Sequence, residues 1–79
     1  MLVIIYLRNG QTFKIGNAKV PSDFLVGIKD GRERMDRFIF QRIIDYPNGL
    51  LTFSTGGKIF SVMTKDISAW EVDYEYNGR

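Results

Sequence analysis

The chain has 79 residues, of which 44% are hydrophobic and 25% charged, and its formal net charge is +2. This length predicts a single domain, residues 1–79, with a modest core that oligomerisation would supplement. Cysteine and histidine are both absent, which excludes disulfides, histidine-bound zinc and the Cys–His and Ser–His–Asp catalytic groups. We therefore expect a protein that is not an enzyme, with no catalytic residue, no cofactor and no metal.

No apolar run approaches the roughly 20 residues of a membrane-spanning helix. The apolar residues 1–7 are too few for a span. They also lack the positively charged stretch and the small-residue cleavage site of a signal peptide. We expect no membrane contact and, in a chain without cysteine, a cytoplasmic location.

The first predicted element is a β-hairpin over residues 2–16. Residues 3–7 are β-branched, aromatic or leucine, which suits a packed strand. Asn9-Gly10 supplies two residues that accept positive φ, as a type I′ turn requires. Residues 12–15 then alternate polar with apolar, as a half-buried return strand does.

The middle of the chain is predicted to continue as strands joined by turns. Pro21 cannot donate to a central ladder, so the residues around it form a connection. Residues 24–28 and 38–46 are rich in β-branched and aromatic residues and are expected to be strands. Between them, residues 29–37 hold four basic and three acidic residues around Gly31, a composition typical of a solvated turn.

The C-terminal part is predicted to be a meander. Pro47, Asn48 and Gly49 form a turn, strands follow over residues 50–54 and 58–63, and residues 64–66 make a short or 3₁₀ turn. The last strand covers residues 70–76. Its strict alternation places Trp70, Val72, Tyr74 and Tyr76 on one face and Glu71, Asp73 and Glu75 on the other.

Short strands at this spacing, separated by Gly, Pro and Asn turns, predict an all-β fold. No window of the sequence shows a convincing helical period of apolar residues. We expect a small antiparallel SH3-like barrel or a strongly curled sheet of five to six strands.

Two segments resemble the small SH3-like and Sm-like barrels. Leu7-Arg8-Asn9-Gly10 has the form of the first hairpin of Sm-like chains, and residues 65–72 resemble their closing turn and strand. The resemblance implies a barrel. The family's RNA pocket uses an Asp-x-x-x-Asn pattern, where this chain has Asp23 and Gly27, and a basic residue followed by Gly, where it has Lys65 and Asp66. In style the sequence is also similar to small proteins of phages and mobile elements, many of which bind one host protein.

The residues expected to bind a partner lie in the charged turn and in the last strand. They are Arg32, Arg34, Arg37, Trp70, Glu71, Asp73, Tyr74 and Tyr76. Arginine makes bidentate hydrogen bonds to carboxylates and phosphates, and an edge strand can accept a strand from another chain. These residues predict a protein-binding module, with a homo-oligomer as one arrangement. The alternative reading is a solvated loop beside a strand whose aromatic face is packed in the core.

A second alternative is nucleic-acid binding. Residues 1–42 hold eight basic and four acidic residues, a net +4, whereas residues 43–79 hold three basic and five acidic residues, a net −2. Arg32, Arg34, Arg37 and Lys58 would then contact phosphates, although interspersed acids weaken the field. A small ligand held between subunits is a third alternative. The sequence favours the protein partner over nucleic acid.

Overall fold

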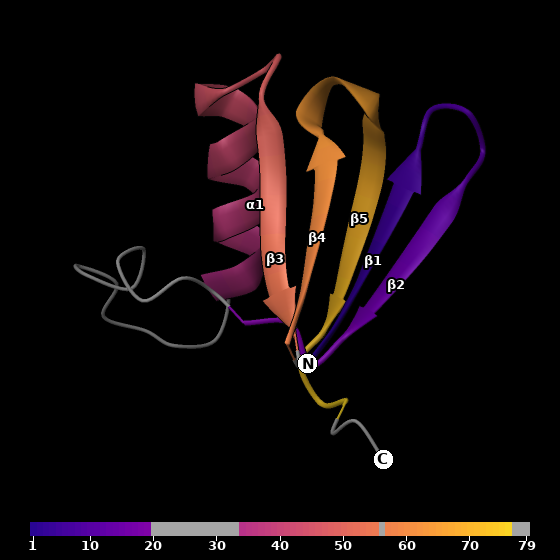
Figure 1. The fold of residues 1–79 in the computed structure, drawn as a ribbon, viewed down its shortest axis with the longest axis vertical. Coiled ribbons are helices and arrows are strands. Elements are labelled where there is room, and N and C mark those ends of the chain that lie inside the picture. Colours follow the sequence, from indigo (N-terminus) through magenta and orange to yellow (C-terminus); the bar gives the residue numbers. More distant parts are fainter. Residues whose placement is uncertain (20–33, 56, 77–79) are drawn as a thin grey trace.

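The computed structural model describes residues 1–19, 34–55 and 57–76. In this part of the chain five strands form two antiparallel sheets, and one α-helix lies against them (Figure 1). The elements in chain order are β1 (Leu2–Leu7), β2 (Thr12–Gly16), α1 (Arg34–Asp45), β3 (Leu50–Thr55), β4 (Lys58–Met63), the 3₁₀ turn η2 (Thr64–Asp66) and β5 (Ile67–Asp73). The protein is therefore mostly β, as the sequence predicts, but it is not all-β.

β1 is the central strand of a three-stranded sheet in the order β2-β1-β5. Its side chains alternate between the two faces, as the period of a strand requires. Val3 and Ile5 are fully buried, whereas Ile4 and Tyr6 lie on the outer face and are partly exposed. On the core face, Trp70 of β5 lies opposite Ile5. One face of the sheet thus belongs to the core and the other faces outward.

The hairpin predicted over residues 2–16 is confirmed, but its turn is not of the predicted type I′. Gly10 takes a positive φ of 91°, whereas Asn9 does not. The Gly10 N–H donates to the Leu7 carbonyl (3.0 Å), and the Leu7 N–H donates to the Gln11 carbonyl (2.8 Å). This is a three-residue loop that ends in a glycine bulge. Asn9 contributes through its side chain, whose Oδ1 accepts the Gln11 N–H at 2.9 Å.

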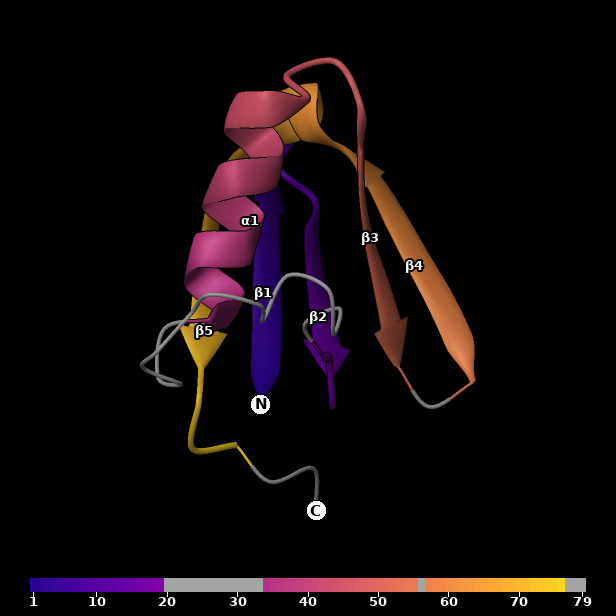
Figure 2. The same cartoon turned by 90° about the vertical axis from the view of Figure 1, so that its left-hand side faces the viewer.

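β3 and β4 form the second sheet, an antiparallel hairpin in which Leu50 lies opposite Met63. Both predicted strands are confirmed, and Gly57 in the turn between them takes a φ of 84°. Within the described ranges, one bridge between Lys19 and Ser54 connects this hairpin with the segment that follows β2. Figure 2 shows the hairpin beside the three-stranded sheet, with β4 as the outermost strand on the side away from α1.

α1 corrects the strand predicted over residues 38–46, and it also includes the last residues of the predicted solvated turn. Its buried side chains are Met35, Phe38 and Ile39, which lie on one side of a helix because they are spaced by three and four residues. A strand would send Phe38 and Ile39 to opposite faces. The helix instead buries both, and the Phe38 ring packs edge-on against Phe53 of β3 with centroids 6.2 Å apart.

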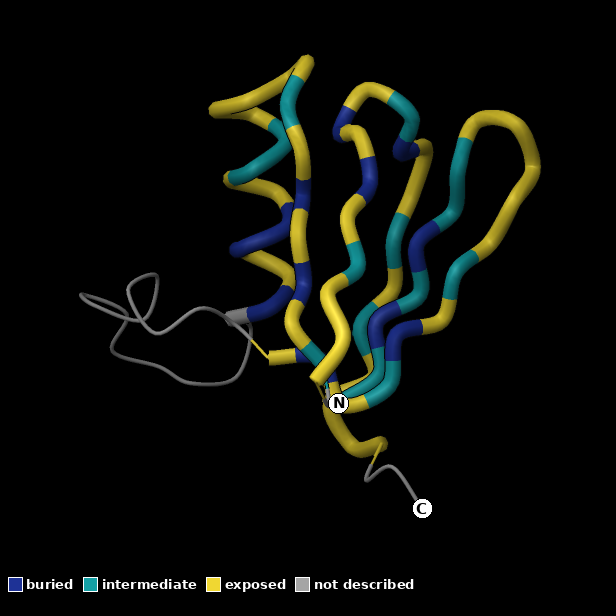
Figure 3. Tube along the Cα trace, in the orientation of Figure 1, coloured by how far each residue is buried: buried dark blue, intermediate teal, exposed yellow. Residues whose placement is uncertain are grey.

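The core fills the space between α1, the β3–β4 hairpin and the inner face of the three-stranded sheet (Figure 3). Its buried hydrophobic residues are Val3, Ile5, Ile15, Ala18, Met35, Phe38, Ile39, Leu51, Phe53, Val62 and Ile67. A second aromatic pair, Phe13 of β2 and Phe60 of β4, has ring centroids 5.1 Å apart and connects the two sheets. Burial of these side chains provides the main favourable contribution to folding.

Thr64 fixes the corner at which α1 turns into β3, and it is the buried polar residue among the described ones. Its hydroxyl donates to the Tyr46 carbonyl and accepts the Gly49 N–H at 3.2 Å, and its own N–H donates to the Gly49 carbonyl at 3.0 Å. A Cβ on Gly49 would lie 2.8 Å from the Tyr46 Cβ, so the turn requires glycine there. The predicted turns at 47–49 and 64–66 are both confirmed.

The last strand starts and ends earlier than predicted. β5 stops at Asp73, so Tyr74 and Tyr76 lie beyond the ladder and do not continue its alternation. The strand predicted over residues 24–28 and residues 29–33 of the charged turn lie outside the described residues.

Candidate protein-binding surface

One side of α1 is buried, and the opposite side is exposed and unusually apolar. Arg37, Phe40, Gln41 and Ile44 lie on this exposed side, and we call these four residues the outer face of α1. Phe40 is 52% exposed and Ile44 is 54% exposed. They are one turn apart and therefore adjacent on the helix surface. A surface helix normally presents polar residues there, so folding does not explain this pair.

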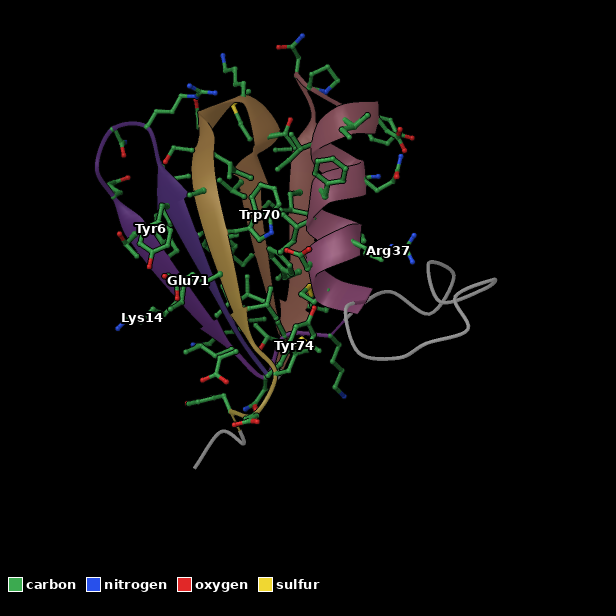
Figure 4. The ribbon with its side chains drawn as sticks, turned by 180° about the vertical axis from the view of Figure 1, so that it is seen from behind. Tyr6, Lys14, Arg37, Trp70, Glu71 and Tyr74 are labelled. Carbon is green, nitrogen blue, oxygen red and sulfur yellow. The ribbon has the colours of Figure 1, made fainter. Side chains whose placement is uncertain are left out.

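Two of the three arginines of α1, Arg37 and Arg42, differ in the contacts that they make. Arg42 Nη2 donates to the Leu50 carbonyl at 2.9 Å, and its guanidinium lies 4.4 Å from the centroid of the Tyr46 ring. Arg42 therefore contributes to the packing of α1 against β3. Arg37 makes no hydrogen bond or ion pair with another described residue, and its side chain points away from the body of the protein (Figure 4). Arg37 is thus free to contact another molecule beside Phe40.

The first turn of α1 is attached to β5 through Asp36. Trp70 Nε1 donates to Asp36 Oδ1 at 2.8 Å, and the Asp36 N–H donates to the Tyr74 hydroxyl at 3.0 Å. The first N–H groups of a helix have no partner within it, so Tyr74 performs the role of a capping side chain. The negative charge of Asp36 is also favourable at this end of the helix dipole. Trp70 and Tyr74 therefore fix the position of α1.

The outer face of the three-stranded sheet carries charges of both signs (Figure 4). Lys14 and Glu71 lie on either side of Ile4. The Tyr6 hydroxyl donates to Glu71 Oε1 at 2.6 Å. This hydrogen bond, followed by desolvation and the charge of the carboxylate, raises the pKa of Tyr6 above its ordinary value. The mixed charges make this face a weak candidate for binding a phosphate backbone.

The residues predicted to bind a partner do not form one patch. Arg37 lies on the outer face of α1, and Trp70 and Tyr74 lie where α1 contacts β5. Glu71 and Asp73 lie on the outer face of the three-stranded sheet. Tyr76 lies over Gly16 at the end of β2. Arg32 lies outside the described residues, and of Arg34 only the backbone, at the start of α1, is described. β5 is an edge strand of its sheet, as the strand-addition hypothesis requires.

The residues predicted for nucleic acid are also separated. Arg37 is on α1, whereas Lys58 is the first residue of β4. No contact between described residues brings the two together. The described residues thus do not bring Arg37 and Lys58 together as one phosphate-binding cluster.

Phe40 and Ile44 were not among the predicted binding residues. Both lie in the segment that was predicted to be a strand, and a strand gives no reason to expect that they share one exposed face. The signal that could have found them is the spacing of Met35, Phe38 and Ile39, because a helix that buries these three leaves Phe40 and Ile44 outside.

Comparison with protein-family models, curated proteins and solved structures found no match to this chain. Within the described residues, no group of three or more carboxylates is placed to hold a metal ion, and no helix has the length and apolar character needed to cross a membrane.

Proposed function

We propose that this chain is a non-enzymatic protein-binding module that contacts its partner through the outer face of α1. The observation that carries the proposal is the exposure of Phe40 and Ile44, each about half exposed, on one side of a helix whose other side is packed in the core. Paired apolar side chains at this spacing are how an amphipathic helix enters an apolar groove. Exposed apolar patches of this kind mark interaction sites.

The charged residue beside the pair defines the chemistry of the partner. Arg37 precedes Phe40 by one turn and has no partner among the described residues, and arginine is enriched at the energetically important positions of interfaces. We therefore propose a partner protein with an apolar groove for Phe40 and Ile44 and a carboxylate placed to accept from Arg37. The stylistic resemblance to phage-encoded accessory proteins adds the proposal that this partner is a protein of the host cell.

The proposed SH3-like relationship is supported by the order of the strands. The structure has two sheets, and the bridge from Lys19, three residues after β2, to Ser54 of β3 would join them in the order β4-β3-β2-β1-β5. This is the order of one strongly curled sheet, so a barrel-like module in which α1 has been added between β2 and β3 is the fold we propose.

The test is capture of a partner from the lysate of the source cell by the immobilised chain. We expect a protein that is retained after nuclease treatment and between about 50 and 200 mM salt, the range over which phosphate-driven binding weakens steeply. The double variant Phe40→Gln/Ile44→Gln should lose it, and Arg37→Glu should weaken its binding at least about tenfold. Gln41→Ala, a change on the same face that removes no apolar group, is the matched control and should still capture the partner.

Two results would count against the proposal. Capture by the double variant equal to that of the wild type would show that the partner binds elsewhere. Recovery of nucleic acid, lost with rising salt and with Arg37→Glu, would favour the phosphate-binding alternative.

A further inference from the structure

The backbone hydrogen bonds of the β3–β4 hairpin show which groups of β4 face its open side. The Thr64 N–H donates to the Gly49 carbonyl at 3.0 Å, in the same register as the hairpin. In an antiparallel pair the residues that exchange hydrogen bonds alternate with residues whose N–H and C=O point away. The backbone groups of Ile59, Ser61 and Met63 therefore point away from β3.

Two contacts on the other side of the hairpin agree with this alternation. The alternation predicts that Leu50 and Ser54 of β3 also direct their backbone N–H and C=O groups away from β4. The Leu50 carbonyl accepts from Arg42, and Ser54 bridges to Lys19. At two of the three outward-facing residues of β3, Leu50 and Ser54, outward groups are thus used within the fold. Those of β4 have no hydrogen-bond partner in the described part of the chain, and Figure 2 shows no described strand beyond β4.

The side chains on the outer face of the hairpin are all uncharged. They are Leu50, Thr52, Ser54, Ile59, Ser61 and Met63. Ile59 is 75% exposed and Met63 is 40% exposed. After Lys58, its first residue, β4 carries no charge, proline or bulge. A charge, a proline or a bulge normally protects an edge strand from pairing with another chain.

We infer that β4 pairs with β4 of a second copy of this chain, antiparallel and about a two-fold axis at Ser61. In this arrangement Ser61 lies opposite Ser61 of the second copy, and Ile59 lies opposite Met63. All three residues exchange N–H···O=C hydrogen bonds with the second copy in both directions. Because Met63 lies beside Leu50 in its own hairpin, Ile59 of one copy completes an apolar cluster with these two residues of the other.

The other edge strands do not suit a two-fold contact. A symmetric contact brings a strand against its own copy, so a charge near the axis meets a like charge. β5 carries Glu71 and Asp73, and β2 carries Lys14 at its centre. β4 is the edge strand on which such a contact places no like charges beside the axis.

The first experiment is the mass of the wild-type chain in solution, by sedimentation velocity or light scattering over a range of concentrations. We expect a species of twice the 9.1 kDa chain mass that dissociates on dilution. Ser61→Lys places two lysines on backbone positions one strand spacing, about 5 Å, apart, and the like charges should weaken the dimer about two- to fivefold. Thr52→Lys is the matched control, because Thr52 lies opposite Ser61 on the same face. It would place the two lysines on backbone positions three strand spacings, about 14 Å, apart, which exceeds the screening length at ordinary salt.

A second pair of variants tests the register of the proposed β4–β4 pair directly, without breaking the dimer. The chain has no cysteine, so Ser61→Cys introduces a single thiol on the proposed axis. Hydrogen-bonded residues of an antiparallel pair have Cα atoms about 5.5 Å apart, within the range for a disulfide. Mild oxidation should convert Ser61→Cys to a covalent dimer and leave Thr52→Cys without one. Non-reducing gel electrophoresis distinguishes the two results.

A wild-type chain that stays monomeric at every concentration would overturn the inference. So would a dimer that dissociates at the same concentration in folded Ser61→Lys as in Thr52→Lys, or one that forms disulfides as readily through Thr52→Cys as through Ser61→Cys. These outcomes are independent of the proposed partner-binding surface, because none of the four variants changes α1.

Discussion

Replacing Asp36 with alanine measures how much the contact between α1 and β5 contributes to stability. The change removes the acceptor of the Trp70 Nε1–H bond (2.8 Å). A hydrogen bond to a charged group contributes about 1.5–3 kcal/mol when buried, and we take about 1 kcal/mol because Asp36 is exposed. Loss of a negative charge from the first turn destabilises the helix by about 0.5 kcal/mol. The better helix propensity of alanine stabilises it by about 0.5 kcal/mol, so the two effects offset each other. The free energy of unfolding should fall by about 1 kcal/mol, or Tm by about 4–8 °C.

Urea and thermal unfolding followed by circular dichroism give this free energy. Trp70 is the only tryptophan, so its fluorescence reports on the same contact. Asp45→Ala is the matched control, because Asp45 is an exposed acid in the same helix that accepts a hydrogen bond only from Gln41 (2.9 Å) among the described residues. Its charge is unfavourable at the C-terminal end, so its loss should change stability by less than about 0.5 kcal/mol. Wild-type stability and unchanged fluorescence in Asp36→Ala would refute the reasoning.

Two further changes test single hydrogen-bonded groups. In the folded state the hydrogen bond to Glu71 raises the pKa of Tyr6. The stability that this bond contributes is therefore complete below the ordinary tyrosine pKa of about 10 and is lost as the pH rises through the folded-state pKa. The stability difference between wild type and Tyr6→Phe, from urea unfolding in an alkaline pH series, should therefore shrink; a constant difference would contradict the assignment. Thr64→Val should lower the free energy of unfolding by about 1 kcal/mol, because it removes the hydrogen bonds of the hydroxyl while the Gly49 N–H still donates to the Tyr46 carbonyl at 3.0 Å. Thr64→Ser keeps that hydroxyl and should lose less; equal losses would mean that packing of the methyl group, not hydrogen bonding, fixes the corner.

Both β-hairpins could be predicted because their information is local. Alternating side chains define the strands, and Gly10 and Gly57 take the positive φ that the two turns require. The type of the first turn could not be predicted, because Asn-Gly suits more than one hairpin loop. In this loop Arg8 binds the η2 segment through its N–H to the Asp66 carbonyl (2.8 Å) and through Nε to the Lys65 carbonyl (2.8 Å). The loop thus contacts residues more than fifty positions away, and such contacts cannot be predicted from the local sequence.

The helix was missed because its apolar residues are not confined to one side. Phe38, Ile39 and Phe40 are consecutive, which is typical of a buried strand, and the exposed Phe40 obscures the helical spacing of the buried residues. The contact that stabilises the start of α1 comes from Trp70 and Tyr74, far along the chain. The same distance explains why the contacts of these two aromatic residues with α1 could not be predicted. Their role in binding a partner stays a prediction.

The residues that concealed the helix are also the ones we propose for binding, and their contribution to folding can be measured separately. Phe40 and Ile44 are about half exposed, so each gains at most about 1 kcal/mol from burial, and glutamine at both positions is a better helix former. The double variant Phe40→Gln/Ile44→Gln should therefore lower the free energy of unfolding by less than about 1.5 kcal/mol. Ile39→Ala, on the buried side of the same turn, should lower it by about 2–5 kcal/mol. If urea unfolding showed equal losses, the outer face of α1 would be packed within the folded chain and would not be free to bind a partner.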